Sequence, residues 1–410
     1  MSKSLQLAAM LLVLSPVALA QVEPAATSGP SVPLPAGNFN YSLRYAQTAE
    51  FGRSLGNWQS GVISGSLDYS NGRQRLPFSM EYGGGYSFNI NGPSYGNGLF
   101  QHLNFTQGMM GRKWNLTVGD NVSYSPQAPT LGFSGIPGIG EPVTTPPPTG
   151  TESILTLNTH VVDNFANASL SRPLNYAWSM HMGGTDDLLR FPNGDGLDTG
   201  TAGASGGLNY RFSARDSILG DYRFSKFTYP AFGFSFFTHS AFFGFERLWS
   251  RSISTDISVG PQWTSSSNSA LVPSSQGVGV NSILTYQKGF NTFSTSYSRG
   301  VNGGSGYLIG SESDVAAANY ARRYGQAVSL GFNVSYMRTA GLANNGITTA
   351  KYGGVEATRR LGRFLAIFAN YSLIDQTSSS TLPGNTLGET VQVLGFGIGY
   401  SPRQHEQPTQ

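Results

Sequence analysis

The stretch R-L-P-F-S-M-E-Y-G-G-G-Y-S-F-N-I, from Arg75 to Ile90, alternates between two kinds of residue. One set is bulky and apolar apart from a single glycine: Leu76, Phe78, Met80, Tyr82, Gly84, Tyr86, Phe88 and Ile90. The other set is small or polar: Arg75, Pro77, Ser79, Glu81, Gly83, Gly85, Ser87 and Asn89. A period of two is the pattern of a β-strand whose two faces meet different environments. The fold therefore depends on which face meets water.

The composition indicates that much of the surface does not face water. Charged residues make up 11% of the 410 residues, against roughly 25% in an ordinary soluble domain. Aromatic residues make up 12%, which excludes the composition of a disordered chain. The net charge of +3 is too small to indicate a nucleic-acid partner. The lack of cysteine excludes disulfides and thiolate metal sites.

The N-terminus has the three parts of a secretory signal peptide. Lys3 provides the positive charge, Leu5–Leu14 the apolar segment, and Ala18-Leu19-Ala20 an A-x-A cleavage site before Gln21. The apolar run is shorter than the roughly 20 residues that span a bilayer as a helix. We therefore expect residues 1–20 to be removed after Ala20 and the mature protein to be exported; a short N-terminal helix is the alternative.

The alternating pattern recurs along the rest of the chain, in pairs of runs joined by eight short junctions. These junctions are Asn71–Gln74, Met110–Arg112, Ser171–Pro173, Ser213–Asp216, Ser250–Ser252, Lys288–Asn291, Arg323–Gly325 and Leu361–Arg363. Each run has about ten residues, the length of a tilted membrane-spanning strand. Longer segments rich in Gly, Pro, Asn and Ser separate the pairs: Pro126–Gly150, Thr185–Gly200, Ser265–Gly277, Val301–Asp314, Ala340–Thr349 and Gln376–Gly388.

Short turns at one end and long loops at the other predict an all-β, up-and-down antiparallel transmembrane β-barrel with short periplasmic turns and long external loops. The eight hairpins give 16 strands, and the runs Phe39–Gln47 and Thr390–Tyr400 raise the number to 18. Sixteen strands remain an alternative. We assign residues 21–37 to a periplasmic lead, 38–400 to the barrel and 401–410 to a tail. A propeller or β-helix would need a fixed repeat length, which the varied loops do not show.

An 18-stranded barrel is too wide for side chains to fill, so the apolar face of each strand is expected to point outward to lipid. The runs Tyr176–Gly183 and Val328–Tyr336 alternate in the same way as the first stretch. Aromatic residues near strand ends fit either interfacial girdles or ordinary strand propensity: Trp114, Tyr124, Trp178, Trp249, Trp263, Tyr297, Tyr336 and Tyr371. Residues that break the phase are Asp120, on the apolar side, and Phe242, Phe364 and Phe368, on the lumen side.

Several segments resemble bacterial outer-membrane β-barrel proteins of the porin type. The chain is most similar to an uncharacterised group of predicted outer-membrane barrels from soil bacteria. The matching segments are Ser134–Gly138 before Glu141-Pro142, Gly300–Gly304, Arg359–Arg363 and Gly395–Tyr400. The resemblance covers essentially the whole mature chain and implies a fold and a location, but no activity. Such barrels often end on an aromatic residue, whereas Tyr400 is followed here by Ser401–Gln410.

Charged residues with the lumen phase are candidates for the wall of a pore. They are Asp68, Glu81, Lys113, Arg211, Asp221, Arg223, Glu246, Asp256, Glu356 and Arg360, joined by His102 and His181. Opposite charges that face each other would set up a transverse field across a pore and a mixed selectivity. Charges paired between neighbouring strands, which fix the register, are the alternative.

The loop Pro126–Gly150 is the candidate constriction. Long loops without secondary structure commonly have a function, and general porins fold their third external loop into the lumen. Phe133 and Ile136 would need burial there, and Glu141 would place a charge at the narrowing. A surface loop packed across the barrel mouth is the alternative.

The acidic loop that contains Asp195 and Asp198 is a weak Ca²⁺ candidate, because closely spaced carboxylates suit this ion. It lacks the spacing of an EF-hand, so a solvated loop is favoured over a metal site. The five histidines lie far apart in sequence, which makes an enzyme the least favoured interpretation. We expect neither a catalytic site nor a cofactor.

The sequence thus predicts a porin-like channel for passive diffusion of small solutes through the bacterial outer membrane. The alternative is a barrel plugged by its loops, with a structural or surface-binding role. The expected partners are outer-membrane lipid, small solutes and two further copies of the chain in a homotrimer, with no nucleic acid.

Overall fold

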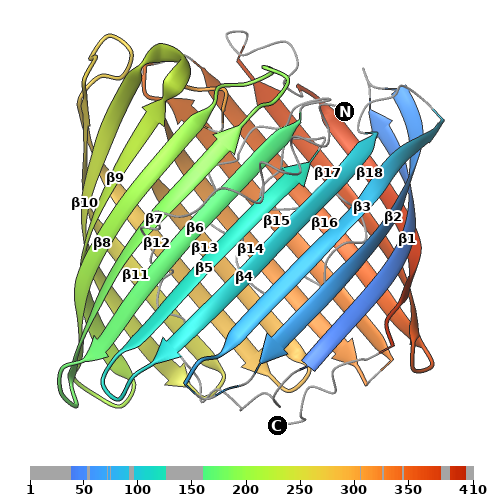
Figure 1. Cartoon of the computed structure of the whole chain (residues 1–410), viewed down its shortest axis with the longest axis horizontal. Helices are drawn as coiled ribbons and strands as arrows, with labels where there is room; N and C mark the ends of the chain where they lie inside the picture. Colours follow the sequence, from blue (N-terminus) through green and yellow to red (C-terminus); the bar gives the residue numbers. More distant parts are fainter. Residues whose placement is uncertain are drawn as a thin grey trace, which may run out of the picture.

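The structure is a computed structural model, and it describes residues 38–52, 56–71, 73, 75–91, 97–125, 160–304, 306–325, 327–343, 346–379 and 388–402. One antiparallel sheet of 18 strands closes on itself, because β1 (Asn38–Gly52) pairs with both β2 (Gly56–Asn71) and β18 (Thr390–Tyr400). Every other strand pairs with its neighbours in the chain, which gives the up-and-down barrel of Figure 1. The predicted fold class is confirmed, with 18 strands and not 16.

The remaining strands follow in chain order. They are β3 (Phe78–Asn91), β4 (Gly98–Met110), β5 (Asn115–Ser125), β6 (Val161–Pro173), β7 (Trp178–Arg190), β8 (Thr199–Arg211), β9 (Asp216–Tyr229), β10 (Phe234–Ser250), β11 (Ile253–Ser266), β12 (Ser275–Lys288), β13 (Asn291–Asn302), β14 (Ser311–Tyr324), β15 (Val328–Gly341), β16 (Ile347–Leu361) and β17 (Leu365–Ser378). A 3-10 turn, Pro230–Phe232, joins β9 to β10. Among the described residues, no helix is long and apolar enough to span a membrane.

The eight predicted junctions lie at or beside the connections at one end of the barrel, here called the turn end. The opposite end, called the loop end, carries the connections β5–β6, β7–β8, β11–β12 and β13–β14. The predicted loops between described strands reach into the strands, as two examples show. Asp186 and Asp187 belong to β7, because their backbone pairing with β6 continues through Leu188 and Leu189 to Arg190, and the β13–β14 loop is Gly303–Gly310.

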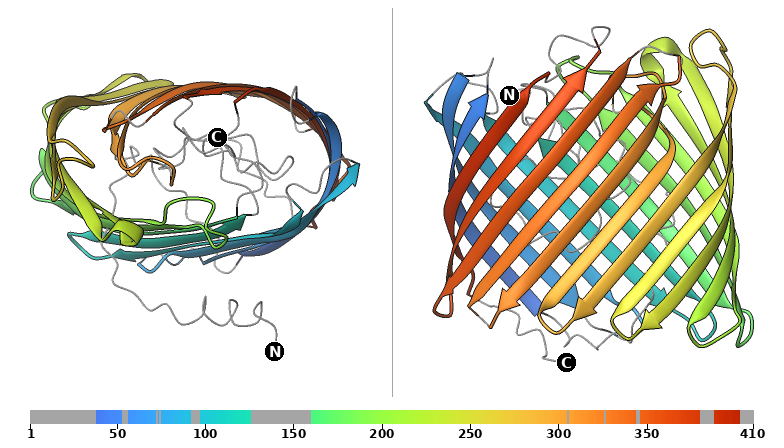
Figure 2. Two further views of the ribbon diagram at one scale, coloured as in Figure 1. Left: turned by 90° about the horizontal axis from the view of Figure 1, so that it is seen from above. Right: turned by 180° about the vertical axis from the view of Figure 1, so that it is seen from behind.

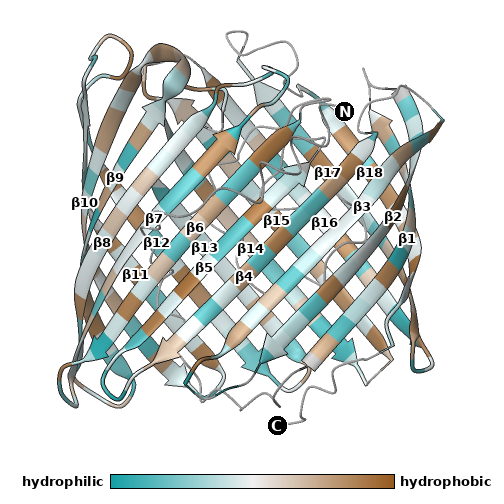
Figure 3. Cartoon of the chain, in the orientation of Figure 1, coloured by the Kyte–Doolittle hydropathy of each residue, from teal (hydrophilic) through white to brown (hydrophobic). Residues whose placement is uncertain are grey.

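The two faces of each strand differ as predicted. On β3, Met80, Tyr82 and Tyr86 are exposed on the outer face, whereas Glu81 lies on the inner face beside His102. Bands of opposite hydropathy alternate along the strands in Figure 3. On β10, outward Phe243 is 61% exposed and inward Phe242 is 8% exposed. The wall therefore has an apolar exterior and a mainly polar interior.

Three residues predicted to break the phase are explained by the structure. Asp120 does face outward on β5, where it accepts a hydrogen bond from Asn164 Nδ2 at 2.7 Å. Phe242 and Phe368 face the lumen. The lumen placement of Phe364 was wrong, because it lies in the turn before β17, 6.3 Å from the ring of Tyr400.

Glycine makes room for large lumen side chains to lie along the wall. A Cβ on Gly279 would come within 2.7 Å of Phe242, and a Cβ on Gly397 would collide with Phe368. Because these rings lie over glycine backbone, they do not project across the barrel. Seen from above, the wall forms a closed oval ring (Figure 2).

Candidate functional site

The lumen wall is the candidate site, and most of the predicted wall charges lie on it. The pairing registers place these on the inner face: Asp68, Glu81, Arg211, Asp221, Arg223, Glu246, Asp256, Glu356 and Arg360. The placement of Lys113 on the wall was wrong, because the chain turns between Met110 and Asn115 and leaves Lys113 exposed at the turn end. Arg211 ends β8 and donates a hydrogen bond to the carbonyl of Tyr176 at 2.9 Å.

A cluster of three interacting side chains, His181, Asp221 and Arg223, lies on β7 and β9. His181 Nε2 lies 3.1 Å from a carboxylate oxygen of Asp221, whose other oxygen accepts a hydrogen bond from Arg223 Nε at 2.6 Å. Gly207 stands between His181 and Asp221 in the register, and a Cβ there would meet the imidazole. The glycine is therefore the reason that the histidine can reach across a whole strand. The guanidinium of Arg223 also lies 4.8 Å from the ring centroid of Phe242.

A similar pair of side chains, Glu81 and His102, lies on β3 and β4. His102 stands directly opposite Gly83, over which its ring lies, and its Nε2 is 3.6 Å from Glu81. Both side chains are partly exposed to the lumen, so solvent weakens this interaction. The positive charge of Arg44, on β1, acts on both Glu81 and Glu356. An apolar lumen patch of Ala46, Val62, Phe100 and Phe368 lies on the same side of the barrel.

Two carboxylates face each other on β10 and β11. Glu246 and Asp256 are direct partners in the register, and Ser217 donates a hydrogen bond to Glu246 at 2.7 Å. Like charges directly opposite each other repel in a sheet. The pair therefore makes this part of the wall acidic and does not fix the register.

Sequence reasoning missed further lumen charges: Arg44, Glu50, Asp163, Asp187 and Arg323. Arg44 lies inside the predicted first strand, so its phase alone would have identified it. Glu50 and Asp187 were not predicted as lumen charges because their strands were predicted to end too early. With these residues included, acidic side chains outnumber basic ones on the described lumen wall. The predicted set already held more acidic than basic side chains, and the additional residues extend this acidic excess on the described wall.

The loop Gly303–Gly310 folds inward at the loop end. Tyr307 and Leu308 are buried with Val161, Leu189 and Phe191. A second cluster lies beside it, made of Phe227, Tyr229, Phe234, Phe236 and Val272, with Ile309 packed against it. In the view from above, this orange segment lies inside the ring (Figure 2). The loop thus forms part of the inner surface of the mouth.

Tyr229 fastens both ends of this loop. Its hydroxyl donates to the carbonyl of Gly303 at 2.8 Å and accepts from the amide of Gly310 at 2.7 Å. The amide of Leu197, in the β7–β8 connection, donates to the carbonyl of Gly306 at 2.6 Å. Gly306 has a φ of 72°, and a Cβ there would collide with Phe191. The glycines therefore permit both the tight course of the loop and its close packing.

The predicted constriction residues Phe133, Ile136 and Glu141 lie outside the described residues. The weak Ca²⁺ candidates are described. Asp198 accepts hydrogen bonds from Arg190 Nη1 and from the amide of Phe191, both at 2.9 Å, while Asp195 is exposed. Asp198 therefore shapes the β7–β8 connection. Among the described residues, no three His, Asp or Glu side chains are grouped as metal ligands.

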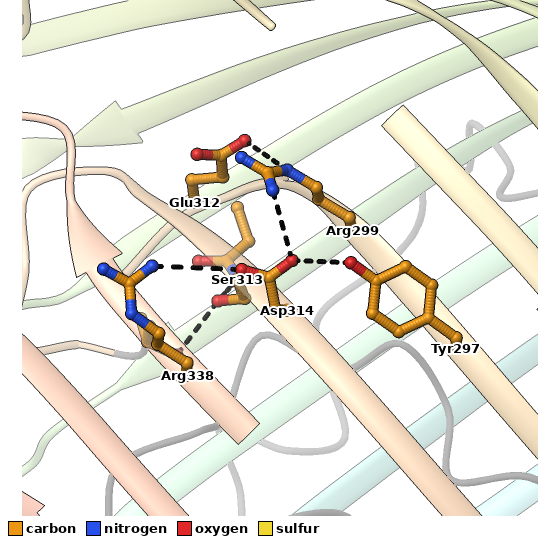
Figure 4. Close-up of polar contacts among 8 residues, drawn as sticks. Tyr297, Arg299, Glu312, Ser313, Asp314 and Arg338 are labelled. Carbon is orange, nitrogen blue, oxygen red and sulfur yellow. Dashed lines mark hydrogen bonds and ion pairs between the residues drawn. The ribbon is translucent and has the colours of Figure 1, made fainter. Parts of the chain in front are cut away.

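A cluster of ion pairs marks the place where the wall divides at the loop end. Above Arg299, β13 pairs with β14 but no longer with β12. Arg299 binds Glu312 at 2.9 Å and Asp314 at 3.6 Å, and Asp314 accepts a hydrogen bond from Tyr297 at 2.8 Å (Figure 4). Arg338, on β15, lies 4.0 Å from Asp314. These contacts tie β13 and β14, which carry the inward loop, to each other and to β15.

No family model matches the sequence, and no curated protein is significantly similar to it. Solved structures match over most of the chain at low identity. OccK5 (OpdH) of Pseudomonas aeruginosa is 12% identical, with a TM-score of 0.44, over 89% of this chain and 98% of its own. OccAB4 of Acinetobacter baumannii is 11% identical, with a TM-score of 0.46, over 89% and 98%. OccK2 (OpdF) of P. aeruginosa, in complex with glucuronate, is 12% identical, with a TM-score of 0.47, over 89% and 97%.

Proposed function

We propose that the protein is a bacterial outer-membrane channel for passive diffusion of small solutes. The observation that carries this proposal is the opposition of the two faces: an apolar exterior around a lumen wall lined by charged and hydroxyl side chains. An apolar outer surface is unfavourable in water, whereas a barrel that spans a bilayer requires one. A closed barrel also leaves no unpaired edge in the lipid. An 18-stranded barrel is wide enough to hold an aqueous channel.

The acidic excess of the wall favours cations and cationic solutes. Rings and rows of carboxylates lower the energy of cations in a pore and raise that of anions. Two groups of carboxylates lie on different sides of the barrel. One side carries Asp221, Glu246 and Asp256, and the other carries Glu81 and Glu356. The positive charges of Arg44 and Arg223 partly offset the negative charge on these two sides. We therefore propose weak cation selectivity.

The export signal and the fate of the termini belong to the same proposal. Cleavage after Ala20 would leave residues 21–37 as a periplasmic lead, and residues 401–410 as a tail at the turn end. Mass spectrometry of the protein from an outer-membrane fraction should give a mature chain that begins at Gln21. A chain that keeps residues 1–20 would contradict this processing.

A plugged barrel with a surface-binding or structural role is the second candidate. The inward loop Gly303–Gly310 favours it, because its apolar side chains are buried at the mouth. Single-channel recording in planar bilayers separates the two functions. Stepwise conductance of the intact protein supports the channel. Conductance that appears only after deletion of Pro126–Gly150 or Gly303–Gly310 supports the plugged barrel.

The described histidines give no support to an enzyme. The hydrogen bonds of His160, His181 and His239 go to Tyr124, Asp221 and Tyr222. A hydrolytic site would need a histidine that activates a nucleophile such as serine. We therefore propose transport and not catalysis.

A further inference from the structure

The turn end of the barrel is strongly basic. Of the 25 Lys and Arg residues in the chain, 15 lie in the eight segments that turn there, and these segments contain one carboxylate, Asp216, which lies 3.5 Å from Arg247. The segments are 71–77, 110–115, 171–178, 211–217, 247–253, 288–291, 322–328 and 359–365. Positive charge is therefore concentrated at this end, because the whole chain has a net charge of only +3.

The outer wall near the loop end is different, because its cations on β13–β17 have carboxylate partners within the chain. Arg299 contacts Glu312 and Asp314, and Lys351 lies 3.6 Å from Asp375. These pairs leave little net charge on this part of the outer surface. The excess of positive charge on the same strands is thus confined to their turn ends.

Three cations at the turn end point to the outside of the barrel. Lys288, Arg322 and Arg359 lie near the ends of β12, β14 and β16, and all three are exposed. Arg322 stands opposite Leu330 and Arg359 opposite Ile367, both of which have the phase of the apolar outer face. None of the three cations has an ion pair among the described residues. We call them the cationic rim, and their turns lie side by side at the lower end of the right-hand view in Figure 2.

The cationic rim has the geometry of a phosphate site. Lys288 and Arg322 both stand opposite Asn291, so they share a row and are two strand spacings, about 10 Å, apart. Their long side chains can therefore both reach a phosphate group placed between them, and ammonium and guanidinium groups are the usual ligands of phosphate. The guanidinium of Arg322 lies 4.6 Å from the ring centroid of Tyr324, a contact that uses none of its N–H donors.

Apolar side chains beside the rim favour a lipid over a soluble anion. At the turns, Phe290 is 60% exposed and Tyr324 is also exposed, as expected for rings at the depth of lipid headgroups. Further up the outer wall, on β15 and β16, Phe332, Val334 and Val355 are exposed. A ligand that joins a phosphate to hydrocarbon chains would match both the cations and the apolar wall above them.

We propose that the cationic rim binds an anionic phospholipid, with phosphatidylglycerol as its test ligand, in the periplasmic leaflet of the outer membrane. Cations near a membrane surface attract lipids that carry net negative charge. Phosphatidylethanolamine has the same phosphate, but its ammonium group cancels the charge and is repelled by the rim. The rim should therefore enrich phosphatidylglycerol around the turn end.

Two double arginines provide matched variants for the test. In Arg322-Arg323 and Arg359-Arg360, the first residue points outward and the second has the lumen phase. Native mass spectrometry of the intact protein in detergent, with equal amounts of phosphatidylglycerol and phosphatidylethanolamine, gives the ratio of the two bound lipids. The outward variant Arg322→Gln/Arg359→Gln should lower this ratio by about 25-fold, at about fivefold for each cation. The control Arg323→Gln/Arg360→Gln removes the same charge from the lumen face of the same strands and should keep the ratio.

A measurement on the wild type needs no variant to fold. The ratio of bound phosphatidylglycerol to phosphatidylethanolamine should fall as the ionic strength rises, because salt screens exposed charges. A wild type without preference, a preference that salt does not change, or an equal loss in the outward variant and the control would overturn the proposal. Displacement of the lipid by an equal concentration of inorganic phosphate would also overturn it, by showing a site for a soluble anion.

Binding of purified peptidoglycan is the other outcome to be separated. Peptidoglycan binding that only the outward variant loses, together with equal binding of the two lipids, would assign the rim to the cell wall and refute the lipid site. The inference rests on the proposed membrane location and not on channel activity. A conducting protein without the lipid preference would refute the lipid site alone, and a lipid-binding protein without conductance would refute the channel alone.

Discussion

Replacing Tyr229 with phenylalanine should release the inward loop without disturbing the barrel. Tyr229 is fully buried, and its hydroxyl is the donor to Gly303 and the acceptor from Gly310. Tyr229→Phe would leave a buried carbonyl and a buried amide without this partner. Each stranded group costs about 1–3 kcal/mol, so the closed loop should lose at least about 2 kcal/mol relative to an open one. That loss corresponds to a roughly 30-fold larger open population.

Hydrogen exchange followed by mass spectrometry measures this change directly on the peptide that contains Gly303–Gly310. Exchange in this loop should accelerate by the same roughly 30-fold factor, while exchange in β9 and β14 stays as in the wild type. The matched control is Tyr320→Phe, which removes a hydrogen bond of 2.9 Å to Asn291 on the outer wall, far from the loop. Equal exchange of the loop in Tyr229→Phe and wild type would show that Tyr229 does not hold it.

Three further predictions concern the wall. Glu81→Gln should shift the reversal potential slightly toward that of an anion-selective pore and leave the unfolding midpoint in urea unchanged, because Glu81 is a solvated lumen charge. A large loss of stability would mean that the lumen and lipid faces are assigned the wrong way round. Gly83→Leu should lower single-channel conductance, since the new side chain displaces the His102 ring from the wall into the lumen, whereas an unchanged conductance would show that the ring does not border the ion path. Leu103→Arg, on the outer face of β4, should destabilise the membrane-inserted barrel by about 2–4 kcal/mol. The matched variant Asn104→Arg, on the lumen face of the same strand, should be tolerated. Equal unfolding midpoints of the two variants in lipid vesicles would contradict the assignment of the two faces.

The sequence was sufficient for the parts of the fold that depend on local alternation. The period of two in Arg75–Ile90 assigned the faces of β3, and the turn residues gave the eight short connections. The same phase placed Glu81, Asp221 and Glu356 on the lumen wall. It even identified Asp120 as an outward residue, although its partner Asn164 is 44 positions away and could not be recognised from spacing.

The rest depends on contacts between distant segments. Two adjacent carboxylates interrupt the alternation of β7, so Asp186 and Asp187 were placed in a loop although the backbone pairing continues to Arg190. The inward loop Gly303–Gly310 has no periodic pattern, and its anchor Tyr229 is separated from Gly303 by 74 positions. Likewise, the reach of His181 to Asp221 depends on Gly207 in the intervening strand, which only the register reveals.

The reversal potential of single channels in a KCl gradient distinguishes an open, cation-favouring pore from a closed barrel. We expect stepwise conductance in planar bilayers and a reversal potential with the sign of a weakly cation-selective pore, because carboxylates outnumber cationic groups on the described lumen wall. Absence of conductance steps at every salt concentration, or a reversal potential with the anion-selective sign, would contradict it.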